Sequence, residues 1–233
     1  MFKKLMLVGY LTLVSHYSYA DENDINDFRA SFGTGWQLEK EDRTRQIISH
    51  TRQEVGKRFR SFKSEVIVKS TMKTLALILF DFDNYPKWFW QVREAHLLQK
   101  ISPTEFIWYV EHDAPLNLPN RDAILHTVID PATETKTYAT LNIKTVKNYL
   151  PERQGIVRIQ EEELKLKLTP ISANNIKIEI QGYVDPSGIV PIWATNLAQK
   201  SAPYASALGL KRMTNTLKYR DALDEPLFQL VQN

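Results

Sequence analysis

The chain has 233 residues, no cysteine, and 30 Lys and Arg against 27 Asp and Glu. Hydrophobic residues make up 43% of the sequence, which is too high a fraction for a disordered chain. Because cysteine is absent, disulfides, zinc–thiolate sites, iron–sulfur clusters and a cysteine nucleophile are all excluded. No apolar run reaches the roughly 20 residues that a bilayer-spanning helix needs.

Residues 1–20 have the organisation of a secretory signal. Two lysines precede the apolar run Leu5–Val14, and Ser18 and Ala20 stand at the positions expected for cleavage. We expect cleavage before Asp21 and export to the periplasm, or secretion, as a protein without a lipid anchor. The alternative is a buried N-terminal helix or a membrane anchor.

The formal charge of +3 changes when this segment is removed. Lys3 and Lys4 leave with the signal, so that 28 basic residues face 27 acidic ones in the mature chain. The remaining basic residues alternate with acidic ones, as in residues 39–43, and form no basic stripe. We therefore expect no nucleic-acid partner.

The first part of the mature chain is predicted to contain both helices and strands. Asp24–Phe32 has the pattern of a short helix, and the runs Gln46–Thr51 and Phe62–Val68 are rich in residues that favour strands. Apolar residues within Thr71–Phe82 recur at helical spacing, with Thr71 as the expected N-cap.

A series of strands separated by turn residues follows this helix. The predicted strands are Val92–Gln99, Glu105–His112, Asp122–Ile129, Thr137–Val146, Gly155–Ile159, Leu164–Leu168 and Ile176–Val184. Clean alternation in the last two indicates a sheet with one buried and one wet face. The apolar phase changes between Val157 and Leu164, which we attribute to a bulge or a bend near residues 160–163.

The last long element is a helix at about Val190–Leu217 that contains Pro203. The order of elements predicts an α+β fold in which one curved antiparallel sheet wraps around this C-terminal helix and leaves an internal hydrophobic tunnel. We assign residues 21–218 to one domain and residues 219–233 to a C-terminal tail.

The sequence offers no recognisable catalytic machinery. The histidines form no metal-binding pair, and there is no nucleophile elbow or phosphate-binding loop. We interpret Asp81/Asp83 and Glu111/Asp113 as structural or solvated acids, and Glu161–Glu163 as a solvated patch. We therefore expect no catalytic residue, no metal and no cofactor.

Several motifs recur in a characteristic order between Trp36 and Met213. They are Trp36-x-Leu38-x-Lys40-Glu41, Tyr85-Pro86-x-Trp88, Asn120-Arg121-Asp122, Gly155-Ile156-Val157-Arg158, and Asp185-Pro186-x-Gly188-x-Val190-Pro191 followed by Asn196 and Pro203. Together they resemble the START family of StAR-related lipid-transfer domains, within the helix-grip (SRPBCC) superfamily. The resemblance implies a monomer that holds one lipid in the tunnel, contacts membranes transiently and performs no catalysis.

Strand parity supplies candidate ligand-binding residues, and so does a stripe along the C-terminal helix, the helix stripe, that includes Trp193, Leu197, Tyr204 and Leu208. These are Phe106, Trp108, Val110, His112, Ala123, Leu125, Thr127, Tyr183, Trp193, Leu197, Tyr204 and Leu208. The acid and arginine that cholesterol-carrying relatives place in the tunnel correspond to Val110 and Thr127, so a sterol mode that relies on this pair is not expected. Release requires opening, which we place at residues 188–191 and at Pro203.

Two other functions stay open on the sequence alone. A polyketide cyclase-like enzyme on the same fold would need an acid or base inside the tunnel, for which His112 and Tyr183 are the candidates. A cell-envelope interaction module would instead use the apolar segment Leu227–Val231 to bind a partner.

Overall fold

The computed structural model describes residues 35–115 and 118–232. The expected signal sequence and the expected helix Asp24–Phe32 lie outside these residues. The helices and strands of the described part are β1 (Gln37–Asp42), β2 (Ile47–Arg52), β3 (Ser61–Lys69), α2 (Met72–Leu79), the 3-10 helix η1 (Phe82–Lys87), β4 (Val92–Ser102), β5 (Glu105–His112), β6 (Asn120–Asp130), β7 (Ala139–Thr145), β8 (Ile156–Arg158), β9 (Glu161–Ser172), β10 (Asn175–Asp185), α3 (Ile192–Met213) and α4 (Leu217–Arg220).

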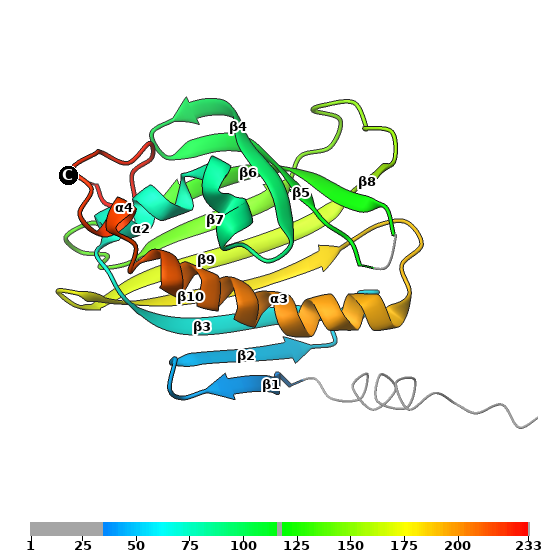
Figure 1. The fold of residues 1–233 in the computed structure, drawn as a ribbon, viewed down its shortest axis with the longest axis horizontal. Coiled ribbons are helices and arrows are strands. Elements are labelled where there is room, and N and C mark those ends of the chain that lie inside the picture. The colour runs from blue at the N-terminus through cyan, green and yellow to red at the C-terminus, as the bar shows by residue number, and fades with distance from the viewer. Residues whose placement is uncertain (1–34, 116–117, 233) are drawn as a thin grey trace, which may run out of the picture.

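The strands form one curved sheet in the order β1-β2-β3-β10-β9-β7-β6-β5-β4, with every neighbouring pair antiparallel. α3 lies across the concave face of this sheet, and α2 and η1 cover one end of the same face (Figure 1). This arrangement confirms the predicted helix-grip architecture. Among the described residues, no helix combines the length and the apolar character that crossing a bilayer requires.

The short strand β8 pairs with the start of β6 in parallel. Arg158 and Asp122 join the two strands through a buried ion pair, in which Arg158 Nε lies 2.7 Å from Asp122 Oδ1. β8 ends at residue 158 and β9 begins at residue 161, so the change in apolar phase occurs between two separate strands. A break between two strands, and not a bulge, therefore accounts for the change in phase.

The first helix begins as predicted. The backbone N–H of Thr74 donates to Thr71 Oγ1 at 3.1 Å, which makes Thr71 the N-cap of α2. Leu75, Ala76 and Leu79 of this helix are buried in the main core.

β5 is buried on both faces. Phe106 and Trp108 point into the main core, whereas Ile107 and Tyr109 pack in a smaller cluster with Ile124 on the opposite face. This explains why consecutive residues of β5, and not only alternate ones, are apolar or aromatic. Both faces of the strand are covered, and only one of them faces the helix α3.

The segment after α4 packs against the domain. Phe228 is fully buried, and its ring stacks on that of Phe106 with 4.1 Å between centroids. The backbone N–H of Ala132 donates to the Leu230 carbonyl at 2.9 Å, and Leu230 is also buried. Two apolar side chains on which a partner-binding tail would depend are therefore used within the core.

Candidate functional site

A cavity of about 280 Å³ lies between the concave face of the sheet and α3. Its walls come from the sheet, α2, η1 and α3, and most of the side chains that line it are apolar. Leu164 and Leu166 of β9 and Ile178 and Ile180 of β10 form its floor, because alternate residues of a strand point to the same face. The volume is near the lower end of the range of about 300–1,000 Å³ typical of ligand pockets.

α3 turns small side chains toward this cavity. Ala194, Ala198, Ala202 and Ser206 recur every four residues on the helix face that lines the space. Larger side chains at these positions would occupy the gap between helix and sheet. The cavity therefore depends on the small residues of α3 as much as on the apolar residues of the strands.

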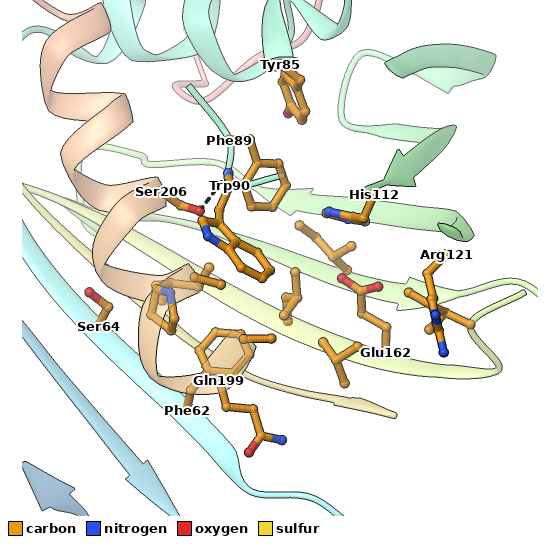
Figure 2. Close-up of a pocket in the computed structure, with 18 of the residues that line it drawn as sticks. Phe62, Ser64, Tyr85, Phe89, Trp90, His112, Arg121, Glu162, Gln199 and Ser206 are labelled. Carbon is orange, nitrogen blue, oxygen red and sulfur yellow. Dashed lines mark hydrogen bonds between the residues drawn. The ribbon is translucent and has the colours of Figure 1, made fainter. Parts of the chain in front are cut away.

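The segment around η1 closes the top of the cavity and is attached to α3. The backbone N–H of Trp90 donates to Ser206 Oγ at 3.2 Å (Figure 2). A Cβ atom at Gly209 would lie 2.1 Å from the carbonyl oxygen of Trp88, so the close approach of helix and loop requires glycine. Tyr85 is buried, and its hydroxyl donates to the Leu79 carbonyl at 2.5 Å.

Three polar side chains on the wall already have partners inside the protein. Trp108 Nε1 donates to Thr127 Oγ1 at 2.9 Å, and both residues are buried. His112 hydrogen-bonds to the backbone of Trp90, and burial lowers the pKa of its ring to about 4. His112 is therefore neutral near pH 7.

Glu162 is the acidic residue among the described wall residues that have a buried polar atom without a partner, the others being Ser64, Trp88, Thr195 and Gln199. Its side chain is buried, Oε2 has no hydrogen-bond partner, and burial raises its pKa to about 7. Figure 2 shows its carboxyl group directed into the cavity, on the side of His112. Our interpretation of residues 161–163 as a solvated patch is wrong for Glu162, because this residue shares the inward face of β9 with Leu164.

Arg121 lies at the same end of the cavity. It is the second residue of β6, opposite His112 on β5, and it is buried. Its guanidinium group donates to the Pro119 carbonyl, and no Asp or Glu oxygen of the described residues lies within 4 Å of it. Burial lowers the pKa of Arg121 from its ordinary value. No cluster of three or more His, Asp or Glu side chains suited to a metal is found in the described part of the chain.

Comparison with known proteins finds similarity to lipid-transfer proteins. No protein-family model matches the sequence. The crystal structure of a STAR-related lipid transfer protein from Xanthomonas axonopodis superimposes with a TM-score of 0.70 and 27% identity, covering 78% of this chain and 99% of that one. This chain is similar in fold and in sequence to a START lipid-transfer protein.

Two curated proteins are similar in sequence to this chain. An uncharacterized protein of Pseudomonas aeruginosa is 23% identical over 177 residues, which are 76% of this chain and 85% of that protein. Human phosphatidylcholine transfer protein is 27% identical over 129 residues, which are 54% of this chain and 59% of that protein.

The structure separates the candidate ligand-binding residues into two groups. Four of them line the cavity: Phe106, Trp108, His112 and Thr127. Val110, Ala123 and Leu125 are buried in the core of the same face but do not line the cavity. That any of them contacts a ligand stays a prediction.

Residues expected from the helix stripe do not line the cavity. Trp193 and Leu197 lie on the outer face of α3, with exposed fractions of 45% and 51%. Tyr204 donates from its hydroxyl to Asp42 Oδ2 at 2.7 Å, and Leu208 packs at the edge of the core. Tyr183 is outside the cavity too, with the Lys57 ammonium 4.3 Å from its ring centroid.

The sequence analysis missed the alanines of α3, as well as Arg121 and Glu162. The sequence nevertheless contains patterns that could have identified the alanines and Glu162. The four-residue repeat of Ala194, Ala198 and Ala202 is visible in the sequence, and Glu162 has the same strand parity as Leu164 and Leu166. The large residues of the helix and the adjacent glutamates concealed both patterns.

Proposed function

We propose that this protein is a START-type protein, which binds one hydrophobic lipid in the cavity under α3 and carries it between membranes without chemical change. The observation that carries the proposal is the apolar cavity between sheet and helix, left open by small residues on α3. Each CH₂ group removed from water contributes about 0.8 kcal/mol, so a lined cavity competes with a membrane for an acyl chain. The names of the Xanthomonas and human relatives, both transfer proteins, support the same reading.

The outer face of α3 supports a transient contact with a membrane. Ile189, Trp193 and Leu197 recur every four residues around the start of the helix and are 93%, 45% and 51% exposed. Apolar and tryptophan side chains on an exposed helix face insert at the boundary between headgroups and acyl chains. Since the opposite face of the same helix lines the cavity, membrane contact here would act on the element that encloses the lipid.

The two residues that the sequence named as candidate acid or base, His112 and Tyr183, do not favour catalysis. Burial lowers the pKa of the His112 ring to about 4, so the ring is neutral near pH 7 and is a weak base, and Tyr183 lies outside the cavity. His112 also hydrogen-bonds to the Trp90 backbone. Turnover of a polyketide-like substrate that is abolished by His112→Ala would revive the cyclase-like alternative.

We also propose export through the N-terminal signal and function as a periplasmic or secreted monomer. The N-terminal sequence of protein recovered from the cell envelope should begin at Asp21, and light scattering should give the mass of one chain. Protein that retains Met1 and stays in the cytoplasm would contradict the export proposal.

Native mass spectrometry of protein purified without detergent tests lipid binding. We expect a lipid adduct on the wild type and its loss in Ala198→Trp, which fills the cavity from α3. The matched control is Leu197→Trp, which adds the same side chain on the exposed face of the same helix and should retain the adduct. A bare polypeptide mass for the wild type, with no lipid in an organic extract, would contradict the proposal.

A further inference from the structure

The cavity has a polar end and an apolar end. β6 and β9 both run antiparallel to β7, so the second residues of these two strands, Arg121 and Glu162, lie at the same end of the sheet. β5 finishes at this end with His112, which pairs with Arg121 across the strands. The opposite end is formed by aromatic and aliphatic side chains, among them Phe80 and Phe106.

Two charged groups at the polar end are not satisfied by the protein. Arg121 and Glu162 are 7% and 5% exposed. Arg121 has five N–H donors, and one of them is used by the Pro119 carbonyl among the described residues. Glu162 Oε2 has no partner. Buried polar groups in native proteins are generally paired, so unpaired groups that face a cavity indicate a ligand.

The balance of charge identifies the kind of ligand group. Arg121 is cationic and has no carboxylate within 4 Å in the described part of the chain, and His112 is neutral near pH 7. Glu162 carries a proton on part of the molecules at neutral pH, and in that form it donates a hydrogen bond. Asp113 also lines the cavity, but it is half-exposed and its carboxylate lies 3.5 Å from Arg93. The buried part of the polar end therefore offers donors and positive charge, which an oxyanion satisfies best.

We infer that Arg121 and Glu162 form a headgroup subsite for an acidic amphiphile, whose phosphate or carboxylate lies at this end of the cavity while its apolar chain extends toward Phe80 and Phe106. This inference rests on the proposed function of the cavity. The guanidinium group pairs with the oxyanion, and the protonated Glu162 carboxyl donates to one of its oxygens.

The subsite requires a defined dependence on pH. The titratable groups that line the cavity are Tyr85, His112, Asp113, Arg121 and Glu162. Asp113 is half-exposed and lies 3.5 Å from Arg93, and the titratable side chains of Tyr85 and Arg121 do not change charge between pH 6 and pH 8. Glu162 ionises in this interval and then repels an anion. With a pKa of about 7, binding of an anion that requires the protonated form weakens about tenfold from pH 6 to pH 8.

Three probes with the same 16-carbon chain test the subsite by titration calorimetry. Palmitate has a carboxylate, 16:0 lysophosphatidylglycerol has a phosphodiester of constant charge, and 1-palmitoylglycerol is neutral. We expect at least one acid to bind on the order of tenfold more tightly than the neutral probe, and the two acids distinguish a carboxylate from a phosphate. Arg121→Gln should remove this preference while the affinity for 1-palmitoylglycerol changes by less than about twofold.

Glu162→Gln should abolish the pH dependence of lysophosphatidylglycerol binding, whereas Glu163→Gln, on the outward face of β9, should preserve it. Equal affinity for all three probes in the wild type would overturn the subsite and leave lipid binding intact. Failure of all three to bind would overturn both. If Arg121→Gln does not fold, the preference of the wild type and the Glu162→Gln pH profile still decide the question.

Discussion

The buried carboxyl of Glu162 should make the stability of this protein depend on pH in a specific direction. Burial raises its pKa from 4.5 to about 7 in the folded state. Below about pH 4.5 the carboxyl is protonated in both the folded and the unfolded chain, so the shift has no effect. As the pH rises toward 7 and above, the unfolded chain ionises freely while the folded chain pays for a buried charge.

The magnitude follows from the shift itself. One pKa unit corresponds to about 1.4 kcal/mol, so the free energy of unfolding should fall by up to about 3 kcal/mol between pH 4.5 and pH 8 on account of Glu162. Glu162→Gln retains the size of the side chain and cannot ionise. The variant should match the wild type near pH 4.5 and be more stable than it at pH 8.

Urea unfolding at several pH values between 4.5 and 8 measures this difference. Glu163→Gln is the control, because its side chain is exposed on the neighbouring position of the same strand and should not change the profile. A difference between wild type and Glu162→Gln that stays constant with pH would refute the reasoning. It would show that the carboxyl is not desolvated in the folded protein.

Three further substitutions test the packing around the cavity. Phe228→Ala should lower the free energy of unfolding by about 3–5 kcal/mol in urea, because a fully buried ring is lost, whereas Leu223→Ala, at an exposed position, should change it little. Gly209→Ala should destabilise by about 1–3 kcal/mol, since its Cβ meets the Trp88 carbonyl; an unchanged melting temperature would contradict this close approach. Thr71→Ala should cost about 1 kcal/mol through loss of the α2 cap, and an equal cost for Thr71→Ser would show that the hydroxyl is not responsible.

Much of the architecture could be predicted because it depends on local patterns. Alternation in residues 164–168 and 176–180 identified two central strands and the face that each turns inward. The Thr71 cap and the helical spacing after it identified α2. These signals lie within one element and do not require knowledge of what packs against it.

The orientation of α3 could not be predicted in the same way. Large apolar residues normally mark the buried face of a helix, and on that basis Trp193 and Leu197 were expected to face the sheet. In the structure they are exposed, and alanines face the cavity. A helix that encloses an open space reverses the usual pattern, because its inner face must be small to leave room and its outer face remains apolar.

The positions of Glu162 and of the C-terminal segment could not be predicted, for a related reason. Three consecutive glutamates are usually solvated, and only the register of β9 shows that the middle one points inward. Residues 226–232 follow a charged stretch, and only the tertiary structure shows that Phe228 stacks on Phe106. In both cases the deciding partner is distant in the sequence.

A crystal structure of the protein purified with its natural ligand tests the central claim most directly. The account predicts continuous density for one lipid between the sheet and α3, along Leu164, Leu166 and Ile178. An unfilled cavity with the lipid held instead on the outer face of α3, against Trp193 and Leu197, would contradict it.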